Sequence, residues 1–415
     1  MKMMEALNNE KKKDTDMKQR MLNAMCVFLI SLAMLFATSP SAAAPTGEIS
    51  FSYLHHWESR PSLPSNQTDM SVIPRFVVDG SHDITWVIEP ALRARGDSSD
   101  TIEFDFYKSQ LRTYTDNVDI TAGYDVVFWG SSEGAQILDI LNQRDLGADF
   151  DGDVKLGQPL LSLNRSIGDG LATLYYLPYT PKRRFRDNSE RLTAGFDINE
   201  NSAQWHDHQD AYYPGFAGRY ALSADSMDVA LIGFHGVNRS PAFVPQAGQF
   251  SPVYRVATQV GMDMQWVSED LLAKLELLNV SDAPTIDGDF DTATQWVVSA
   301  EYSFYSVFDS IADVRVIAEY SDNSLGERLL SLYQHDLLMA VHTSFNNADS
   351  TSLSVSWLHD LDSDSNLIDI SLTHRLNDNI ELEASLYEFS SLASRDFFFG
   401  LEPDSFGEIT LTYYF

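Results

Sequence analysis

The last seven residues, Ile409-Thr410-Leu411-Thr412-Tyr413-Tyr414-Phe415, decide the fold class that the sequence predicts. Side chains at positions 409, 411, 413 and 415 are apolar or aromatic, and those between them are threonine or tyrosine. Successive side chains of a β-strand point to opposite faces, so this stretch predicts a strand with one apolar face and one polar face. The same alternation continues through much of the chain upstream.

Long alternating stretches precede this terminal strand. They include 118–128, 254–264, 296–304, 314–320 and 380–386. Many reach the roughly ten residues that a strand needs to cross a bilayer at a tilt, whereas ordinary strands average about five or six. Their polar faces carry full charges, such as Glu301 and Glu383, and aromatic residues gather at their ends. A soluble β-sandwich also alternates, but these features favour an all-β antiparallel transmembrane β-barrel of about 16 strands (14–18).

The composition excludes several classes of protein. The 415 residues carry 28 Lys and Arg against 60 Asp and Glu, a formal net charge of −32. Such an acidic chain has no general affinity for nucleic acid, which needs basic residues to displace its counterions. The single cysteine, Cys26, excludes an internal disulfide, a thiolate zinc site and a Cys-x-x-Cys redox centre.

The N-terminal segment has the pattern of an export signal. Lys18 and Arg20 precede the apolar run 24–37, which is followed by the small residues 41–44. A basic region, a short apolar region and an A-x-A-like site predict a secretory signal peptide over residues 1–43. The apolar run is shorter than the about 20 residues of a spanning helix. The barrel is therefore expected over residues 44–415, after export into the periplasm.

The aromatic terminal strand resembles the assembly signal of Gram-negative outer-membrane β-barrel proteins, whose last residue is typically Phe. The resemblance implies a location in the cell outer membrane, contact with outer-membrane lipid, and recognition of Tyr413 and Phe415 by the barrel-assembly machinery. A second resemblance is to large porin-like barrels, akin to alginate-export barrels. It rests on the stretches 125–130, 137–145, 175–178 and 404–406. It implies a porin-like fold without specifying a substrate.

If the apolar side chains of each strand meet lipid, the alternation assigns the charged side chains to the lumen. The predicted pore-lining residues are Glu89, Arg93, Arg95, Asp119, Asp125, Arg255, Asp263, Glu301, Asp313, Arg315, Glu319, Arg375, Glu381 and Glu383. A barrel of about 16 strands is wide enough for a water-filled channel.

We therefore expect passive passage of ions or small hydrophilic solutes, with a modest preference for cations because carboxylates outnumber guanidinium groups in the predicted lumen. A wall carboxylate in such a water-filled lumen, for example Glu301, is expected to tolerate replacement by glutamine. Two alternatives stay open, a barrel with a structural or surface-interaction role and a barrel hydrolase. No cofactor is expected.

The segment Ser131–Asp153 is the candidate for a constriction. Its apolar residues, Ile137 and Leu138 among them, are spaced to give one short helix an apolar face that can pack against the barrel wall. An external loop helix is the equal alternative. The segment also begins with a Gly-x-Ser-x-Gly match around Ser132, but the chain lacks the β-α-β alternation that supports a nucleophile elbow. A turn rich in small residues explains the match about as well as a nucleophile does.

Four polar clusters are weak candidates for ion binding. The acidic stretches 149–153 and 287–291 lack the glycine and glutamate of an EF-hand, so solvated loops are the favoured interpretation. His206 and His208 have no evident third ligand, and no metal is expected. The basic stretch 182–186 is suited to lipid phosphates or to a channel mouth, with an ordinary basic loop as the alternative.

Overall fold

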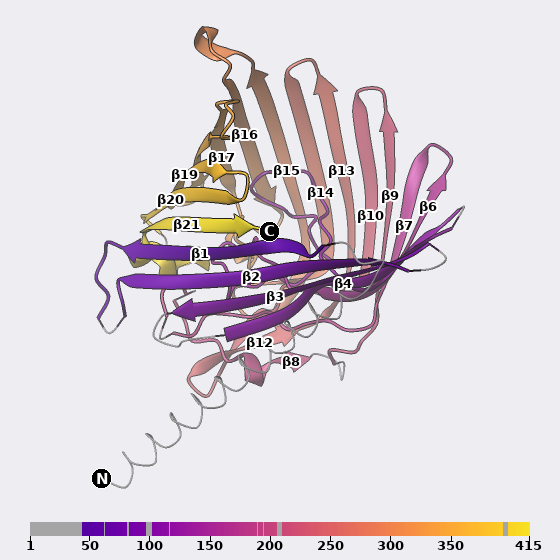
Figure 1. The fold of residues 1–415 in the computed structure, drawn as a ribbon. Coiled ribbons are helices and arrows are strands. Elements are labelled where there is room, and N and C mark those ends of the chain that lie inside the picture. Colours follow the sequence, from indigo (N-terminus) through magenta and orange to yellow (C-terminus); the bar gives the residue numbers. More distant parts are fainter. Residues whose placement is uncertain are drawn as a thin grey trace.

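The computed structural model of the chain describes residues 44–61, 63–80, 83–96, 102–115, 117–188, 190–193, 195–205, 210–392 and 397–415. The predicted signal peptide lies outside these residues. Within them, eighteen strands form one closed antiparallel sheet, which confirms the predicted β-barrel (Figure 1). No helix in the described part of the chain is long and apolar enough to cross a membrane.

The barrel strands follow the order of the chain. They are β1 (Thr46–His56), β2 (Asn66–Asp79), β3 (Ile84–Gly96), β4 (Ile102–Tyr114), β5 (Asp119–Asp125), β6 (Gln158–Ile167), β7 (Gly170–Leu177), β9 (Gly215–Ala224), β10 (Met227–Val237), β13 (Val256–Ser268), β14 (Leu271–Pro284), β15 (Phe290–Phe304), β16 (Asp313–Asn323), β17 (Asp336–Ser344), β18 (Ser352–Asp360), β19 (Asn366–Asn377), β20 (Ile380–Ser390) and β21 (Phe406–Tyr414). Each pairs with the next barrel strand, and β21 pairs with β1.

The seam between β1 and β21 closes the sheet so that it has no free edge. Gly47 and Phe415 exchange both backbone N–H···O bonds at 3.0 Å, which places the terminal aromatic residue at the seam. Closure satisfies every strand edge within the wall, as a barrel that crosses a bilayer requires. The count of eighteen is two above the estimate of about 16 and within the predicted range. Connections of only two residues, such as 168–169 and 378–379, use less chain than the estimate allowed.

The two faces of β15 carry the side chains that the sequence predicted for them. On β15, Val298 is 50 % exposed on the outer face, whereas Glu301 is 3 % exposed on the inner face. Large apolar side chains are exposed on the outer face of many other strands, for example Leu231 and Ile409. The outer face is thus apolar, and the charged positions of these strands point into the barrel.

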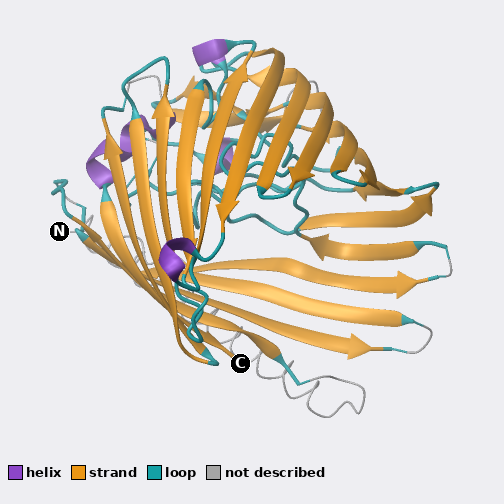
Figure 2. Cartoon of the chain, turned by 90° about the horizontal axis from the view of Figure 1, so that it is seen from above, coloured by secondary structure: helices purple, strands orange, loops and turns teal. Residues whose placement is uncertain are grey.

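The two ends of the barrel differ. Turns of two residues, for example between β9 and β10 and between β13 and β14, lie at the end that carries Phe415. The opposite end carries the long connections, including 126–157 and 178–214. Two of these connections together form a small sheet, in which β11 (Ala242–Gln246) pairs with β12 (Gln249–Tyr254), and β12 pairs in parallel with β8 (Gln204–Trp205) of the connection 178–214. Figure 2 shows loops that run across the interior between the walls.

Candidate functional site in the barrel lumen

One connection, residues 126–157, folds into the barrel, and we name it the lumen segment. It leaves the wall after Asp125 and returns at Gln158, which is directly paired with Asp125, so both of its ends lie at one point of the wall. The sequence predicted a short helix between Ser131 and Asp153, and this prediction is wrong, because the residues form a series of turns and bends. Their placement inside the barrel agrees with the constriction interpretation rather than with an external loop.

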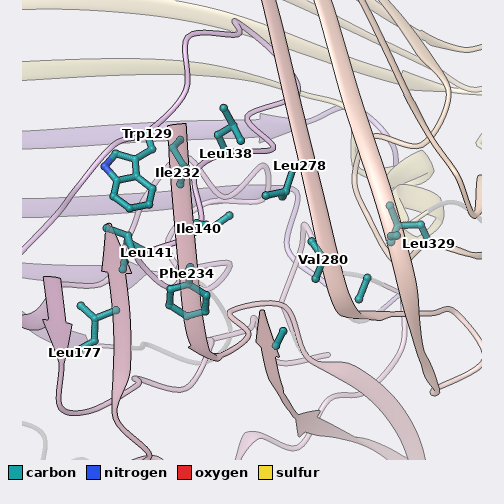
Figure 3. Close-up of a cluster of buried hydrophobic side chains, with 14 of the residues drawn as sticks. Trp129, Leu138, Ile140, Leu141, Leu177, Ile232, Phe234, Leu278, Val280 and Leu329 are labelled. Atoms are coloured by element: carbon teal, nitrogen blue, oxygen red, sulfur yellow. The ribbon is translucent and has the colours of Figure 1, made fainter. Parts of the chain in front are cut away.

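The lumen segment packs on the inner wall through an apolar cluster. Trp129, Leu138, Ile140 and Leu141 of the segment contact apolar side chains of β10, β13, β14 and β15 (Figure 3). On the wall these partners include Ile232, Phe234, Leu278, Val280 and Ala293. All of these side chains are buried. Burial of apolar surface at about 25 cal/mol per Å² makes this cluster a main source of the free energy that holds the segment in place.

Two glutamates of the wall bind the backbone of the segment. The N–H groups of residues 131 and 132 donate to Glu276 of β14, and those of 133, 134 and 135 donate to Glu319 of β16, the latter at 2.9, 3.1 and 2.7 Å. Successive N–H groups in a tight turn form a concave site for an anion. Gly130, with φ +96°, starts that turn, so the glycine-rich match around Ser132 serves as a carboxylate-binding turn.

Ion pairs add a third set of contacts between segment and wall. Lys274 of β14 pairs with Glu301 of β15 and, at 3.6 Å, with Glu133 of the segment. Arg315 of β16 approaches Glu301 at 3.3 Å and Glu133 at 4.0 Å. Lys274 and Glu301 are buried, whereas Arg315 is 43 % exposed toward the interior. Because each charge has a partner of opposite sign, the network offsets the cost of burying charged groups.

The far part of the lumen segment, residues 145–154, is bound by arginines from two other regions of the chain. Arg95 of β3 donates to the carbonyl oxygen of Gly147 and approaches Glu103 of β4 at 3.4 Å. Arg184 pairs with Asp145 of the segment at 3.2 Å. Arg184 belongs to the basic stretch 182–186, which therefore packs on the lumen segment.

A cavity of about 280 Å³ remains between the far part of the segment and the wall formed by β1, β2, β3, β20 and β21. Basic side chains on its lining are Arg93, Arg95 and Arg186. Acidic side chains on the same lining are Asp69, Asp149 and Glu408. Opposite charges thus face one space, which is the arrangement that orients a polar solute or selects it by charge.

Carboxyl groups of the segment itself have shifted pKa values. Burial is the largest cause that raises the pKa of Asp149, and it raises the pKa of Asp151 well above its usual range. The two carboxyl groups interact, and their mutual repulsion also raises the pKa of Asp151. A shared proton between neighbouring carboxyl groups removes this repulsion.

Several of the predicted pore-lining residues contact the lumen segment, among them Arg95 through its bond to Gly147. Glu301, Arg315 and Glu319 do so as described above, and Asp263 accepts a hydrogen bond from Ser131 Oγ at 2.7 Å. Arg93 and Arg95 line the 280 Å³ cavity.

The other predicted residues lie elsewhere on the wall and are not brought together. Glu89 pairs with Arg75 at 3.6 Å, and Arg255 pairs with Asp282 at 3.1 Å. Glu381 accepts from Tyr414 Oη, Glu383 accepts from Ser371 Oγ, and Asp125 is half-buried beside Gln110. Three positions lie at the end with the short turns, namely Asp119, Arg375 and Asp313.

Lys274 and Glu276 make the central contacts to the segment and were not among the residues predicted from the sequence. Both occur at alternate positions of the apolar stretch 271–278, so they share the inner face of β14. Two charges on one face of an otherwise apolar strand are the signal that indicates a buried polar contact. Asp404 is a second case, since it is buried and binds Arg191 at 2.7 Å and Arg60 at 2.8 Å, which joins three outer connections.

Ser132 and the pair His206 and His208 were the candidates for catalysis and for metal binding. Ser132 Oγ donates to the carbonyl oxygen of Ala135, and the Ser132 N–H donates to Glu276, so its hydroxyl is engaged within its own turn. His206 and His208 lie outside the described residues. Among the residues that are described, no three His, Cys, Asp or Glu side chains form a group suited to a metal ion.

Comparison with known proteins places the chain by its fold. No protein-family model and no curated protein sequence matches it. Among solved structures, it is similar to Wzi, an outer-membrane protein involved in group 1 capsule assembly in Escherichia coli and described as a carbohydrate-binding β-barrel. The identity is 10 %, the TM-score is 0.51, and 88 % of this chain and 83 % of Wzi are covered. A mutant Rhodopseudomonas blastica porin has 12 % identity and a TM-score of 0.43, with 90 % of this chain and 100 % of the porin covered.

The chain therefore has the fold of an outer-membrane β-barrel. This conclusion rests on the closed antiparallel sheet, the apolar outer face and the likeness to Wzi.

Proposed function

We propose that the protein is an outer-membrane channel through which ions or small hydrophilic solutes pass passively beside the lumen segment. The observation that carries the proposal is the 280 Å³ cavity lined by three arginines and three carboxylates. It lies between the segment and the barrel wall, on the side of the lumen that the segment leaves uncovered. An 18-stranded barrel is wide enough to keep an aqueous path even when one connection occupies part of it.

The polar inner face of the barrel wall next to this cavity supports the same proposal. The inner faces of β18, β19, β20, β21 and β1 carry hydroxyl and carboxyl side chains such as Ser354, Ser371, Glu383, Thr412 and Ser50, and all of these are half-exposed. Exposure of polar side chains on the inner face indicates room for water there. Ser50, Ser52 and Glu408 belong to this wall and also line the cavity, so the two spaces adjoin.

A barrel that binds a ligand without conducting is the second candidate. Wzi is described as carbohydrate-binding. In this chain the outer end of the lumen holds two apolar clusters, the one around Trp129 and another around Phe150, Phe389 and Phe406. Such packing favours a closed outer end, which suits a structural or surface-interaction role.

Planar-bilayer recording of the refolded residues 44–415 separates the two candidates. Stable unitary currents support the channel, and an intact barrel without currents rejects it. In a KCl gradient the reversal potential tests the charges of the cavity. We expect Glu408→Gln to lower the preference for cations and Arg93→Gln to raise it, because each removes one sign of charge from the same space. Equal reversal potentials for both variants would place the selective step elsewhere.

The proposed location in the outer membrane, with its lipid and the barrel-assembly machinery as partners, has its own test. Phe415 directly follows the terminal strand β21 and bonds to Gly47 across the seam. Deletion of Phe415 should leave the exported chain in the periplasm, which cell fractionation and heat-modifiable gel migration measure. Normal outer-membrane insertion of the truncated chain would contradict the assignment of Tyr413 and Phe415 as an assembly signal.

A further inference from the structure

A second cavity, of about 140 Å³, lies apart from the proposed passage at the loop end of the barrel. The lumen segment, the inner faces of β13, β14 and β15, and the connections near residues 183, 240 and 330 enclose it. Three arginines line it, namely Arg144, Arg183 and Arg239. Their convergence on one space contrasts with the net charge of −32 of the whole chain.

The hydrogen-bond partners of these arginines are neutral. Arg239 is buried and donates to the carbonyl oxygens of Leu141 and Val237, to Thr180 Oγ1 and to Gln158 Oε1. Arg183 donates through Nε to Gln143 Oε1 at 3.0 Å and through Nη2 to the carbonyl oxygen of Arg239 at 3.1 Å. Among the described residues, neither guanidinium lies within 4.0 Å of a carboxylate, and Arg183 Nη1 has no partner. A buried cation, Arg239, and a partly buried one, Arg183, that lack an anion are costly for a fold to keep.

The third arginine, Arg144, differs because carboxylates lie near it. Arg144 donates to the carbonyl oxygen of Gly152 at 3.4 Å, and Asp151 and Asp153 lie near it beyond ion-pair distance. Asp139 also lines the cavity, but its carboxylate is paired with Lys155. Burial lowers the pKa of Arg183 to about 10 and that of Arg239 to about 9, and both guanidinium groups remain charged at neutral pH.

We propose that the 140 Å³ cavity is a binding site for a small oxyanion, such as inorganic phosphate, held between the guanidinium groups of Arg183 and Arg144. The carbonyl oxygen of Arg239 accepts a hydrogen bond from Arg183 and so fixes its position. The guanidinium group of Arg239 adds to the positive potential of the cavity. Guanidinium groups match the oxygen spacing of phosphate and carboxylate. The space holds several water molecules, which is enough for a single oxyanion but not for an oligosaccharide. Because loops and inner strand faces enclose the cavity, the anion comes from solution rather than from a lipid headgroup.

Calorimetric titration of the refolded chain with sodium phosphate in lipid-free detergent, at constant ionic strength balanced with chloride, tests this site. We expect one saturable site, weakened about tenfold or more in Arg183→Gln because a charge-assisted contact is lost. Arg144→Gln should weaken it too. Arg165→Gln is the matched control, since it removes the same charge from an exposed position on β6.

Absence of saturable binding, or equal affinity in the Arg183 and Arg165 variants, would overturn the proposal. If Arg183→Gln does not refold to a heat-modifiable barrel, the Arg144 variant decides by the same comparison. The measurement requires no ion flow through the barrel, so failure of the channel proposal and failure of this one are separate results.

Discussion

Two parts of the barrel wall share one outer pattern and differ on the inside. The packed wall, made of β10 and β13–β16, buries most of its inner side chains under the lumen segment, including Glu276, Glu301 and Glu319. The open wall, made of β18–β21 and β1, keeps most of its inner hydroxyl and carboxyl groups half-exposed. Outer side chains are apolar and exposed on both walls, for example Val298 and Val355. Inner-face residues of identical type therefore have different energetic roles according to what covers them.

Charged side chains have different hydrogen-bond partners on the two walls. On the packed wall, Glu276 and Glu319 accept five backbone hydrogen bonds from the segment, so they position it. On the open wall, Glu383 accepts only from the hydroxyls of Ser371 and Ser385 among the described contacts. A carboxylate on the first wall is part of a buried contact, and one on the second faces the lumen without such a contact.

The largest expected effect follows from removing the lumen segment, which covers the packed wall. Replacement of residues 128–155 by a short Gly-Ser linker is compatible with the wall, because Asp125 and Gln158 are paired neighbours. We expect a severalfold rise in unitary conductance, since an 18-stranded barrel without this segment has a wide aqueous lumen. Single-channel recording measures it, with heat-modifiability as the control for an intact barrel. An unchanged conductance would mean that the segment does not restrict the passage.

The same substitution on both walls gives the next largest difference. Glu301→Gln leaves Lys274 buried without its main partner, and we expect it to lower the free energy of unfolding by about 3–5 kcal/mol. Glu383→Gln on the open wall should cost about 1 kcal/mol or less, since its partners are neutral hydroxyls. This reverses the expectation from the sequence that Glu301 tolerates the change. Urea unfolding in detergent measures both, and equal costs would remove the distinction between the walls.

The outer faces should behave alike. Val298→Arg on the packed wall and Val355→Arg on the open wall each place a charge on the apolar face, and each should cost about 2–4 kcal/mol if it lies near the bilayer midplane. Unfolding in lipid vesicles measures both, and Ser354→Arg, on the inner face of the open wall, is the control with a small expected cost. A large cost for Ser354→Arg with little cost for Val355→Arg would shift the face assignment of β18 by one residue.

The sequence predicts the barrel and its faces well because alternation is a local signal. It fails where contacts distant in sequence decide the backbone. The spacing of Ile137, Leu138, Ile140 and Leu141 fits a helix, but wall glutamates 144 to 186 residues away bind the N–H groups of residues 131–135 in a turn. The alternating stretch 118–128 predicts a strand through residue 128, but β5 ends at Asp125, and Val127 donates its N–H to Asn142 of the lumen segment instead. The two charges on the apolar strand β14 indicate a buried contact, but no local pattern reveals that the lumen segment makes it.

The smallest expected effect concerns the point where the segment reaches the open wall. There Phe150 contacts Phe389 and Phe406, with ring centroids 5.4 and 6.0 Å apart, and Asp149 and Asp151 flank it. Since the folded-state pKa of both carboxyl groups is raised, the native state binds more protons than the unfolded chain between the ordinary aspartate pKa and the raised values. Stability should therefore fall as pH rises through that window, by a few degrees in the thermal midpoint.

Asp151→Asn should flatten this pH dependence, because the amide cannot ionise beside Asp149. At pH values above neutral, the thermal midpoint of the variant should therefore exceed that of the parent chain. Thermal unfolding in detergent from pH 5 to 8 measures the change, with Asp378→Asn in an exposed turn as the matched control. A pH profile of the Asp151 variant parallel to that of the parent chain would assign the dependence to other groups. The contact between the segment and the open wall would then depend on the aromatic cluster around Phe150 alone, and the two walls would be joined without any titratable link.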